Sequence, residues 1–170
     1  MNLSRTERLI LANQYQILEQ IGPEGEREAF ARFREALEHG YEMEYDTIAQ
    51  NVYEKGLTTD ECREVVDALQ VYDMLQISHA ALSAADKAGI NDHDIRFHGF
   101  DGNNETLFMA YAEYFCADDR FTDVVESGEM NSHYPARGRY RAMYAELQEV
   151  PSERWAKLTK VEMLRIIAAG

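Results

Sequence analysis

The sequence has few cysteines, few prolines and no long apolar run. Without a stretch of about 18 apolar residues, no segment is expected to span a membrane. Two cysteines exclude a disulfide-rich scaffold, and although Cys62 and Cys116 could form one disulfide, we interpret both as small core residues. The N-terminus also lacks the apolar region of a secretory signal, so we expect a cytoplasmic protein.

Basic residues are scarce as well. The chain has 17 Lys and Arg and 31 Asp and Glu, which gives a formal net charge of −14. This negative charge disfavours direct binding to nucleic acid or to an anionic membrane. Residues 137–165 are the exception, with seven basic and four acidic side chains. This segment either packs against the acidic remainder, of this chain or of a second subunit, or binds a small anion.

Complete catalytic and metal-binding motifs are absent too. The five histidines are scattered without metal-ligand spacing, and Asp92-His93-Asp94 places its side chains too close in sequence to converge on one ion. The loop starting at Asp101 begins like a calcium loop but has Thr106 where that loop needs glycine. We therefore expect no metal, no cofactor and no catalytic residue that the sequence alone can name.

What the sequence has in abundance is helical periodicity. Ser4 with Glu7, Thr58 with Glu61 and Thr159 with Glu162 each form a capping box at the start of an apolar stripe. We predict an all-α fold, one compact domain over residues 1–170 with seven or eight helices around one long central helix. The main expected helices cover residues 5–20, 26–39, 43–54, 59–84, 105–118 and 136–149, with a short last helix after residue 159.

Two predicted helices carry polar residues within an apolar stripe. In the first, Gln14 lies among Ile10, Ile17, Leu18 and Ile21, and a buried amide requires a hydrogen-bonding partner. The partner could belong to the fold or to a ligand. In the long helix, Asp73 and Gln76 interrupt the stripe, which favours a neighbouring helix, a polar pocket or a subunit interface. The interface alternative predicts a homodimer.

Arg137 and Arg141 are the best candidates for anion binding. They share a helix face near its N-terminus and could bind one carboxylate or phosphate. The structural alternative, ion pairing with the acidic body, is favoured because such arginine pairs are common. An enzyme acting on an anionic substrate would need these arginines and His133, as general base, in one cleft.

Several polar motifs together resemble the YfbU family. They are Arg8-Leu9-Ile10-Leu11-Ala12-Asn13-Gln14-Tyr15, Cys62-Arg63 with Asp67 and Tyr72, Gly99-Phe100-Asp101, Asn131-Ser132-His133 with Pro135 and Tyr140-Arg141, and Leu158-Thr159. The resemblance implies a bacterial helical protein without established activity or catalytic residues. Some relatives carry a DNA-binding segment, which implies a ligand-sensing or protein-interaction role. Because the first helix starts near Ser4, we expect no such segment here.

Our leading hypothesis is therefore a non-enzymatic helical domain that forms a homodimer or binds a protein partner or small anionic ligand. The alternative is a small hydrolase or transferase acting on an anionic substrate. The candidate ligand-binding residues are Gln14, Asp101, His133, Arg137 and Arg141. If the polar motifs converge, they form one hydrogen-bond network that either stabilises the fold or lines a pocket.

Overall fold

The protein is all-helical, as predicted. The computed structural model describes residues 1–170, except the side chain of Ser127. Throughout this described chain the regular elements are α- and 3-10 helices, and the only β-type pairing is one isolated parallel bridge between Phe100 and Asn131. Contacts group the chain into two compact units, residues 1–55 and residues 56–170.

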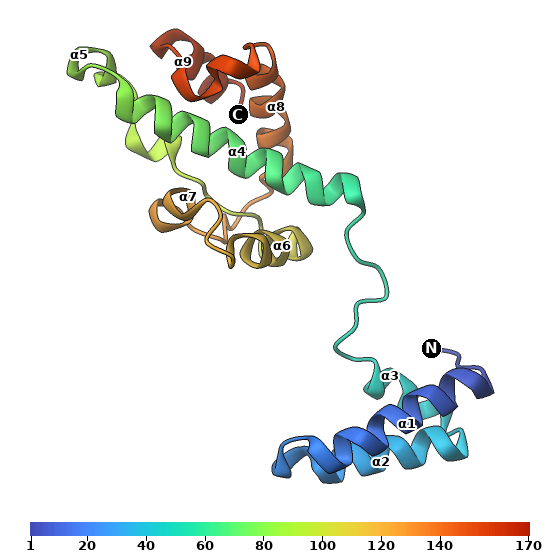
Figure 1. Ribbon diagram of the computed structural model, residues 1–170. Helices are drawn as coiled ribbons and strands as arrows, with labels where there is room; N and C mark the ends of the chain where they lie inside the picture. The colour runs from blue at the N-terminus through green and yellow to red at the C-terminus, as the bar shows by residue number, and fades with distance from the viewer. The chain divides into compact units, whose positions relative to one another are not determined.

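The first unit is a helical hairpin with a short appendage. Its elements are α1 (Arg5–Ile21), the 3-10 turn Glu24–Glu26, α2 (Arg27–His39), the 3-10 turn Glu42–Glu44 and α3 (Tyr45–Ile48). Figure 1 shows α1 and α2 side by side. Gly40 ends α2 in the left-handed conformation, with φ of +73°, as expected of a C-terminal glycine.

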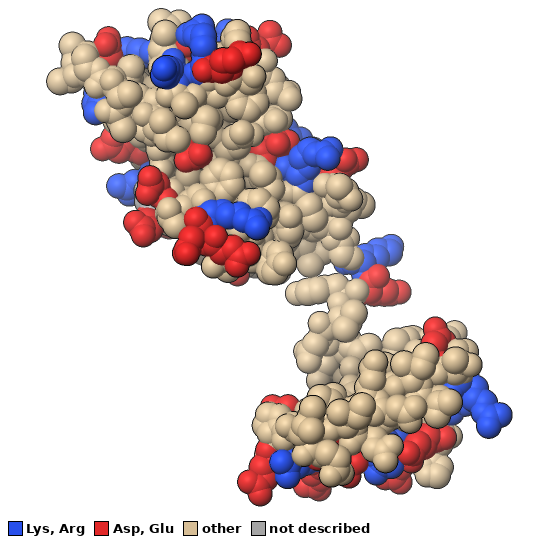
Figure 2. Space-filling model, in the orientation of Figure 1, with Lys and Arg blue, Asp and Glu red and all other residues tan. Residues whose placement is uncertain are grey.

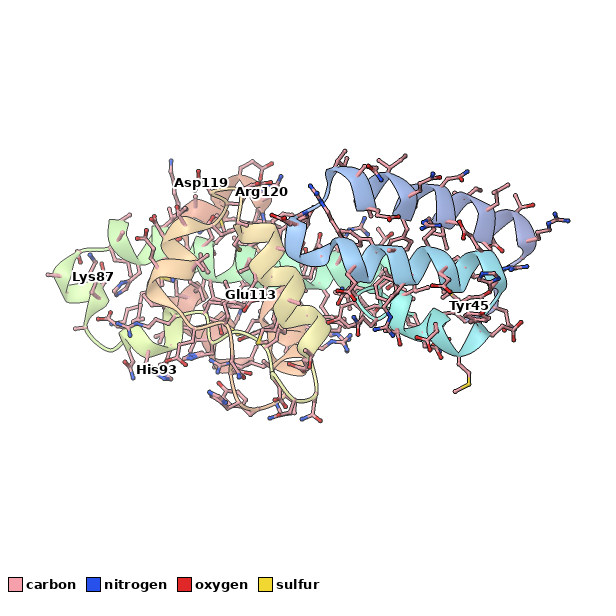
Figure 3. All side chains as sticks on the ribbon, turned by 90° about the horizontal axis from the view of Figure 1, so that it is seen from below. Tyr45, Lys87, His93, Glu113, Asp119 and Arg120 are labelled. Atoms are coloured by element: carbon pink, nitrogen blue, oxygen red, sulfur yellow. The ribbon has the colours of Figure 1, made fainter. Side chains whose placement is uncertain are left out.

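The third helix is much shorter than the predicted range 43–54. Tyr45 is buried against the hairpin, where Figure 3 labels it on α3. Val52 and Tyr53, by contrast, are 75% and 69% exposed. A short helix is marginal in water without tertiary packing, and the residues after Ile48 have too little of it to continue the helix.

The buried face of α1 is not the predicted one. Leu11, Ala12 and Tyr15 face α2, and the Tyr15 ring contacts Phe30 and Phe33 at centroid distances of 6.1 and 5.5 Å. The stripe expected to be buried is exposed instead, including Gln14. Because α1 is apolar around most of its circumference, periodicity alone could not show which face α2 covers.

The second unit is built around the long helix. Its elements are α4 (Thr59–Ala81), α5 (Ala84–Lys87), the 3-10 turn Asp92–Ile95, α6 (Thr106–Cys116), α7 (Thr122–Ser127), α8 (Arg137–Gln148), the 3-10 helix Ser152–Lys157 and α9 (Lys160–Ala168). Figure 1 shows α8 and α9 on one side of α4, with α6 and α7 on the other. Val65, Leu69, Tyr72 and Leu75 of α4 are fully buried between them.

The long helix is confirmed, although it ends at Ala81 rather than residue 84. Leu82 is extended, and the Ser83 hydroxyl accepts a hydrogen bond from the Asp86 amide to start α5. Ser78, on the buried side of α4, is 1% exposed and bonds Trp155 O and Leu158 N. This hydroxyl ties the C-terminal segment to the central helix.

The polar residues of α4 are accommodated inside the second unit. The Gln76 amide donates to the Ile95 carbonyl at 3.1 Å. Asp73 is half-buried, and burial, together with the charge of Asp123, raises its pKa. Gln76 therefore has a partner within the unit, whereas a subunit interface at this stripe stays a prediction.

Candidate functional site

Two loops of the second unit cross next to the aromatic core. The Phe100 amide donates to Met130 O at 3.0 Å, and the Ser132 amide donates to Phe100 O at 3.1 Å. Gly99 precedes the crossing with φ of +76°, and a Cβ there would lie 2.0 Å from the Met130 carbonyl carbon. Glycine is therefore the only residue that lets the loops approach this closely.

Two of the polar motifs, Gly99-Phe100-Asp101 and Asn131-Ser132-His133, meet at this crossing, whereas Asn13-Gln14 belongs to the first unit. Asn131 Oδ1 accepts from the Gly102 and His133 amides at 3.1 and 3.0 Å. Asp101, 2% exposed, accepts from the Asn104 side chain and the Asn103 amide, and these hydrogen bonds hold its pKa below the ordinary value. The side chains of Asp101 and Asn131 thus bond the loops themselves.

A buried carboxylate that the sequence did not single out joins these loops to α8. Glu105, 8% exposed, accepts from the Asp101 amide at 3.1 Å and from the Ala136 and Arg137 amides at 3.0 and 3.2 Å. It therefore occupies the N-terminus of α8, where an anion is most stabilised. Nothing in the sequence distinguished Glu105 among 31 acidic residues, since its partners lie 31 and 32 residues away.

The candidate anion clamp binds a carboxylate of its own chain. Arg137 donates to both oxygens of Glu64 at 3.0 and 2.9 Å, and Arg141 approaches the same carboxylate at 2.9 Å. The Arg137 guanidinium also lies 3.7 Å from the Phe108 ring centroid, in a cation–π contact. The structure thus shows the ion-pairing alternative, in which the basic segment packs against the acidic body.

Glu64 is charged in this arrangement. Burial raises the pKa of its carboxyl, but the hydrogen bonds and charges of Arg137 and Arg141 outweigh burial and hold the pKa below the ordinary value. Its side chain is 13% exposed, whereas those of Arg137 and Arg141 are 27% and 59% exposed. A free anion would have to displace an intramolecular carboxylate that is already in place.

A shallow hollow of about 200 Å³ lies beside this ion pair. Three carboxylates and two arginines contribute to its wall, so it does not select for an anion. Its lining consists of Asp60, Arg63, Glu64, Asp67, Tyr140, Arg141 and Tyr144. His133 is absent from this lining, is exposed and has a left-handed φ of +60°. The candidate base and the candidate clamp therefore do not share this hollow.

The remaining candidate, Gln14, belongs to the first unit. It is exposed on α1, so it is not the buried amide that the stripe predicted. Asp92 and His93 lie in a 3-10 turn capped by Asn91, whose side chain accepts from the His93 amide at 3.0 Å. Among the residues that the structure describes, no three His, Cys, Asp or Glu side chains gather to hold a metal ion.

No described helix has the length and apolar character needed to cross a bilayer.

Cys62 and Cys116 are both free thiols, each partly buried. Burial raises the pKa of Cys116. Cys116 therefore lacks the lowered thiol pKa that is typical of a reactive cysteine.

Comparison with known proteins agrees with the motifs. The model of the YfbU domain matches residues 1–169 and so covers both compact units. The UPF0304 protein MJECS11 of Methanocaldococcus jannaschii is 34% identical over 172 residues, which span 98% of this chain and 99% of that protein. The expectation of a bacterial protein stays a prediction. The chain belongs to the YfbU family.

Proposed function

We propose that this protein is a non-enzymatic domain that acts by binding another protein. Several charged side chains of the polar network already have partners within the chain. Glu64 forms ion pairs with both Arg137 and Arg141, and Glu105 accepts hydrogen bonds from three backbone amides. These contacts support a structural role for the polar network. The proposed binding function is therefore assigned to the surface of the first unit.

The exposed face of α1 carries the proposal. We call Ile10, Gln14, Ile17, Leu18 and Ile21 the α1 stripe. Its four aliphatic members are between 38% and 75% exposed, and all ten residues from Leu9 to Leu18 are uncharged. Figure 2 shows an uncharged expanse over α1, with charged side chains gathered along the edge formed by α2.

The size and composition of this surface are typical of a contact site. From their exposed fractions, the aliphatic members of the stripe leave roughly 400 Å² accessible, which is within the range of the largest apolar patch on a typical monomer, a patch that is often functional. Depletion of charge is the compositional mark of an interface core. In a chain where 28% of residues are charged, a ten-residue segment without charge whose outer face is exposed favours a protein-binding surface.

Site-specific photo-crosslinking in the native host tests this function. A photoreactive amino acid replaces Gln14, at the centre of the α1 stripe, and in a matched control it replaces Glu28, an exposed residue of α2. We expect a discrete protein adduct from position 14 and none from position 28. If position 14 yields no adduct above the control, the protein-binding function is wrong.

A further inference from the structure

The α1 stripe has the spacing of a helix–helix interface. Ile10, Gln14, Ile17 and Ile21 follow one another at intervals of four, three and four residues. This is the alternation that places side chains along one seam of paired helices, where they fit between those of the partner. In α1, one face carries this seam and a second face packs against α2, which is typical of a helix inside a larger bundle.

The first unit has only a small core of its own. Only Ala12, Leu37 and Tyr45 form its buried cluster, whereas a much larger cluster fills the second unit. A single core in a unit of this size rarely supplies more than about 3–5 kcal/mol of stability. A permanent cover over the seam would therefore add substantially to the stability of the unit.

A second copy of the chain can provide such a cover. It is present at equal concentration with the first, and two α1 stripes are identical, as a twofold interface requires. Each copy has a net charge of −14, so two copies repel one another over most of their surface. The uncharged segment from Leu9 to Leu18 is where they can meet without opposing carboxylates.

Gln14 also fits a twofold contact. An amide side chain both donates and accepts hydrogen bonds, so two copies of Gln14 near a symmetry axis can satisfy each other. A single polar residue in an apolar seam sets the register of paired helices. Two stripes of roughly 400 Å² each bury roughly 800 Å² of aliphatic surface, so the flanking polar side chains must supply the rest of the roughly 1,200 Å² at which specific interfaces begin.

We propose that the protein forms a homodimer through the α1 stripe, in which paired hairpins complete a four-helix core. This inference rests on the proposed protein-binding function and names its partner. It places the subunit contact in the first unit rather than at the polar stripe of α4. The long helix remains the centre of each copy's own core.

Light scattering coupled to size exclusion tests the dimer on the full chain. The wild type is expected at twice its chain mass of 19.6 kDa. Ile17→Glu places a charge at the centre of the seam in both copies, and we expect the dissociation constant to rise at least about 100-fold. Met43→Glu is the matched control, because Met43 is 93% exposed and lies outside the stripe.

Circular dichroism of each variant shows whether the helices are retained. Dissociation of Ile17→Glu with a folded second unit and an intact Met43→Glu dimer supports the inference. A monomeric wild type at the highest concentration loaded overturns it, as does an Ile17→Glu dimer of unchanged strength. If the wild type is monomeric but position 14 still crosslinks to a different protein, only the dimer fails and the protein-binding function stands.

Discussion

The stability of the second unit should depend strongly on Glu105. The substitution Glu105→Gln preserves its shape and one acceptor oxygen but removes the charge. Three backbone amides bond the native carboxylate, including that of Ala136, which is fully buried. A hydrogen bond to a charged group contributes about 1.5–3 kcal/mol, and an unpaired buried donor costs about 1–3 kcal/mol. We therefore expect a loss of about 2–4 kcal/mol in the free energy of unfolding.

Urea unfolding monitored by tryptophan fluorescence measures this loss. Trp155 is the only tryptophan and lies partly buried in the second unit, so its signal reports that unit. Glu113→Gln is the matched control, because Glu113 is an exposed residue of α6, the helix that directly follows Glu105, and is labelled in Figure 3. It should change stability by less than about 0.5 kcal/mol. If the two variants differ by less than about 1 kcal/mol, the proposed role of Glu105 is refuted.

Three further predictions concern Gly99, Glu64 and Ser78 of the second unit. Gly99→Ala should destabilise the second unit by more than about 3 kcal/mol, because the added Cβ would meet the Met130 backbone. Gly138 of α8 has open space around it, so Gly138→Ala should instead stabilise the unit by about 0.4–1 kcal/mol. Urea unfolding compares the two variants. The pKa of Glu64 is lowered by folding, so its stabilising contribution is complete above its ordinary pKa of 4.5 and is lost as the pH falls through the lower folded value. Thermal unfolding from pH 7 to pH 3 should therefore show a smaller loss of stability for Glu64→Gln than for the wild type. Ser78→Ala leaves the Leu158 amide unpaired and should cost about 1–3 kcal/mol, against almost nothing for the exposed Ser152→Ala in the same urea assay.

The helices could be predicted from the sequence because their signals are local. Capping boxes begin α1, α4 and α9 with the residues expected, since each involves side chains three positions apart. The long helix was likewise evident from its stripe. The weak helix after Glu44 was overestimated, because its persistence depended on packing that the sequence pattern does not record.

The candidate site was only partly predictable. Arg137 and Arg141 were recognised as a carboxylate-binding pair, but the sequence could not identify Glu64, 73 residues before Arg137, as their partner. Asp101 and Asn131 do meet at one loop crossing, whereas Glu105 went unnoticed because its role depends on tertiary contacts. The burial of α1 was assigned to the wrong face, since aromatic contacts from α2 select Tyr15 over the aliphatic stripe.

The correction to α1 changes how the sequence pattern is interpreted. A regular apolar stripe predicts a face that requires cover, but not whether the same chain supplies that cover. Here the hairpin covers one side of α1 and leaves Ile10, Ile17 and Ile21 accessible. The stripe that suggested a core is therefore the exposed surface on which the proposed protein contact rests.

Carbene footprinting of the purified wild type tests this central claim most directly. Val161 of α9 and Ile21 of α1 are 76% and 75% exposed in the single chain, so an uncovered stripe would label both equally. The account predicts that Ile21 and Ile17 are labelled several-fold less than Val161, and that the difference disappears in Ile10→Glu. Equal labelling of Ile21 and Val161 in the wild type would contradict it, because the α1 stripe would then be open to solvent.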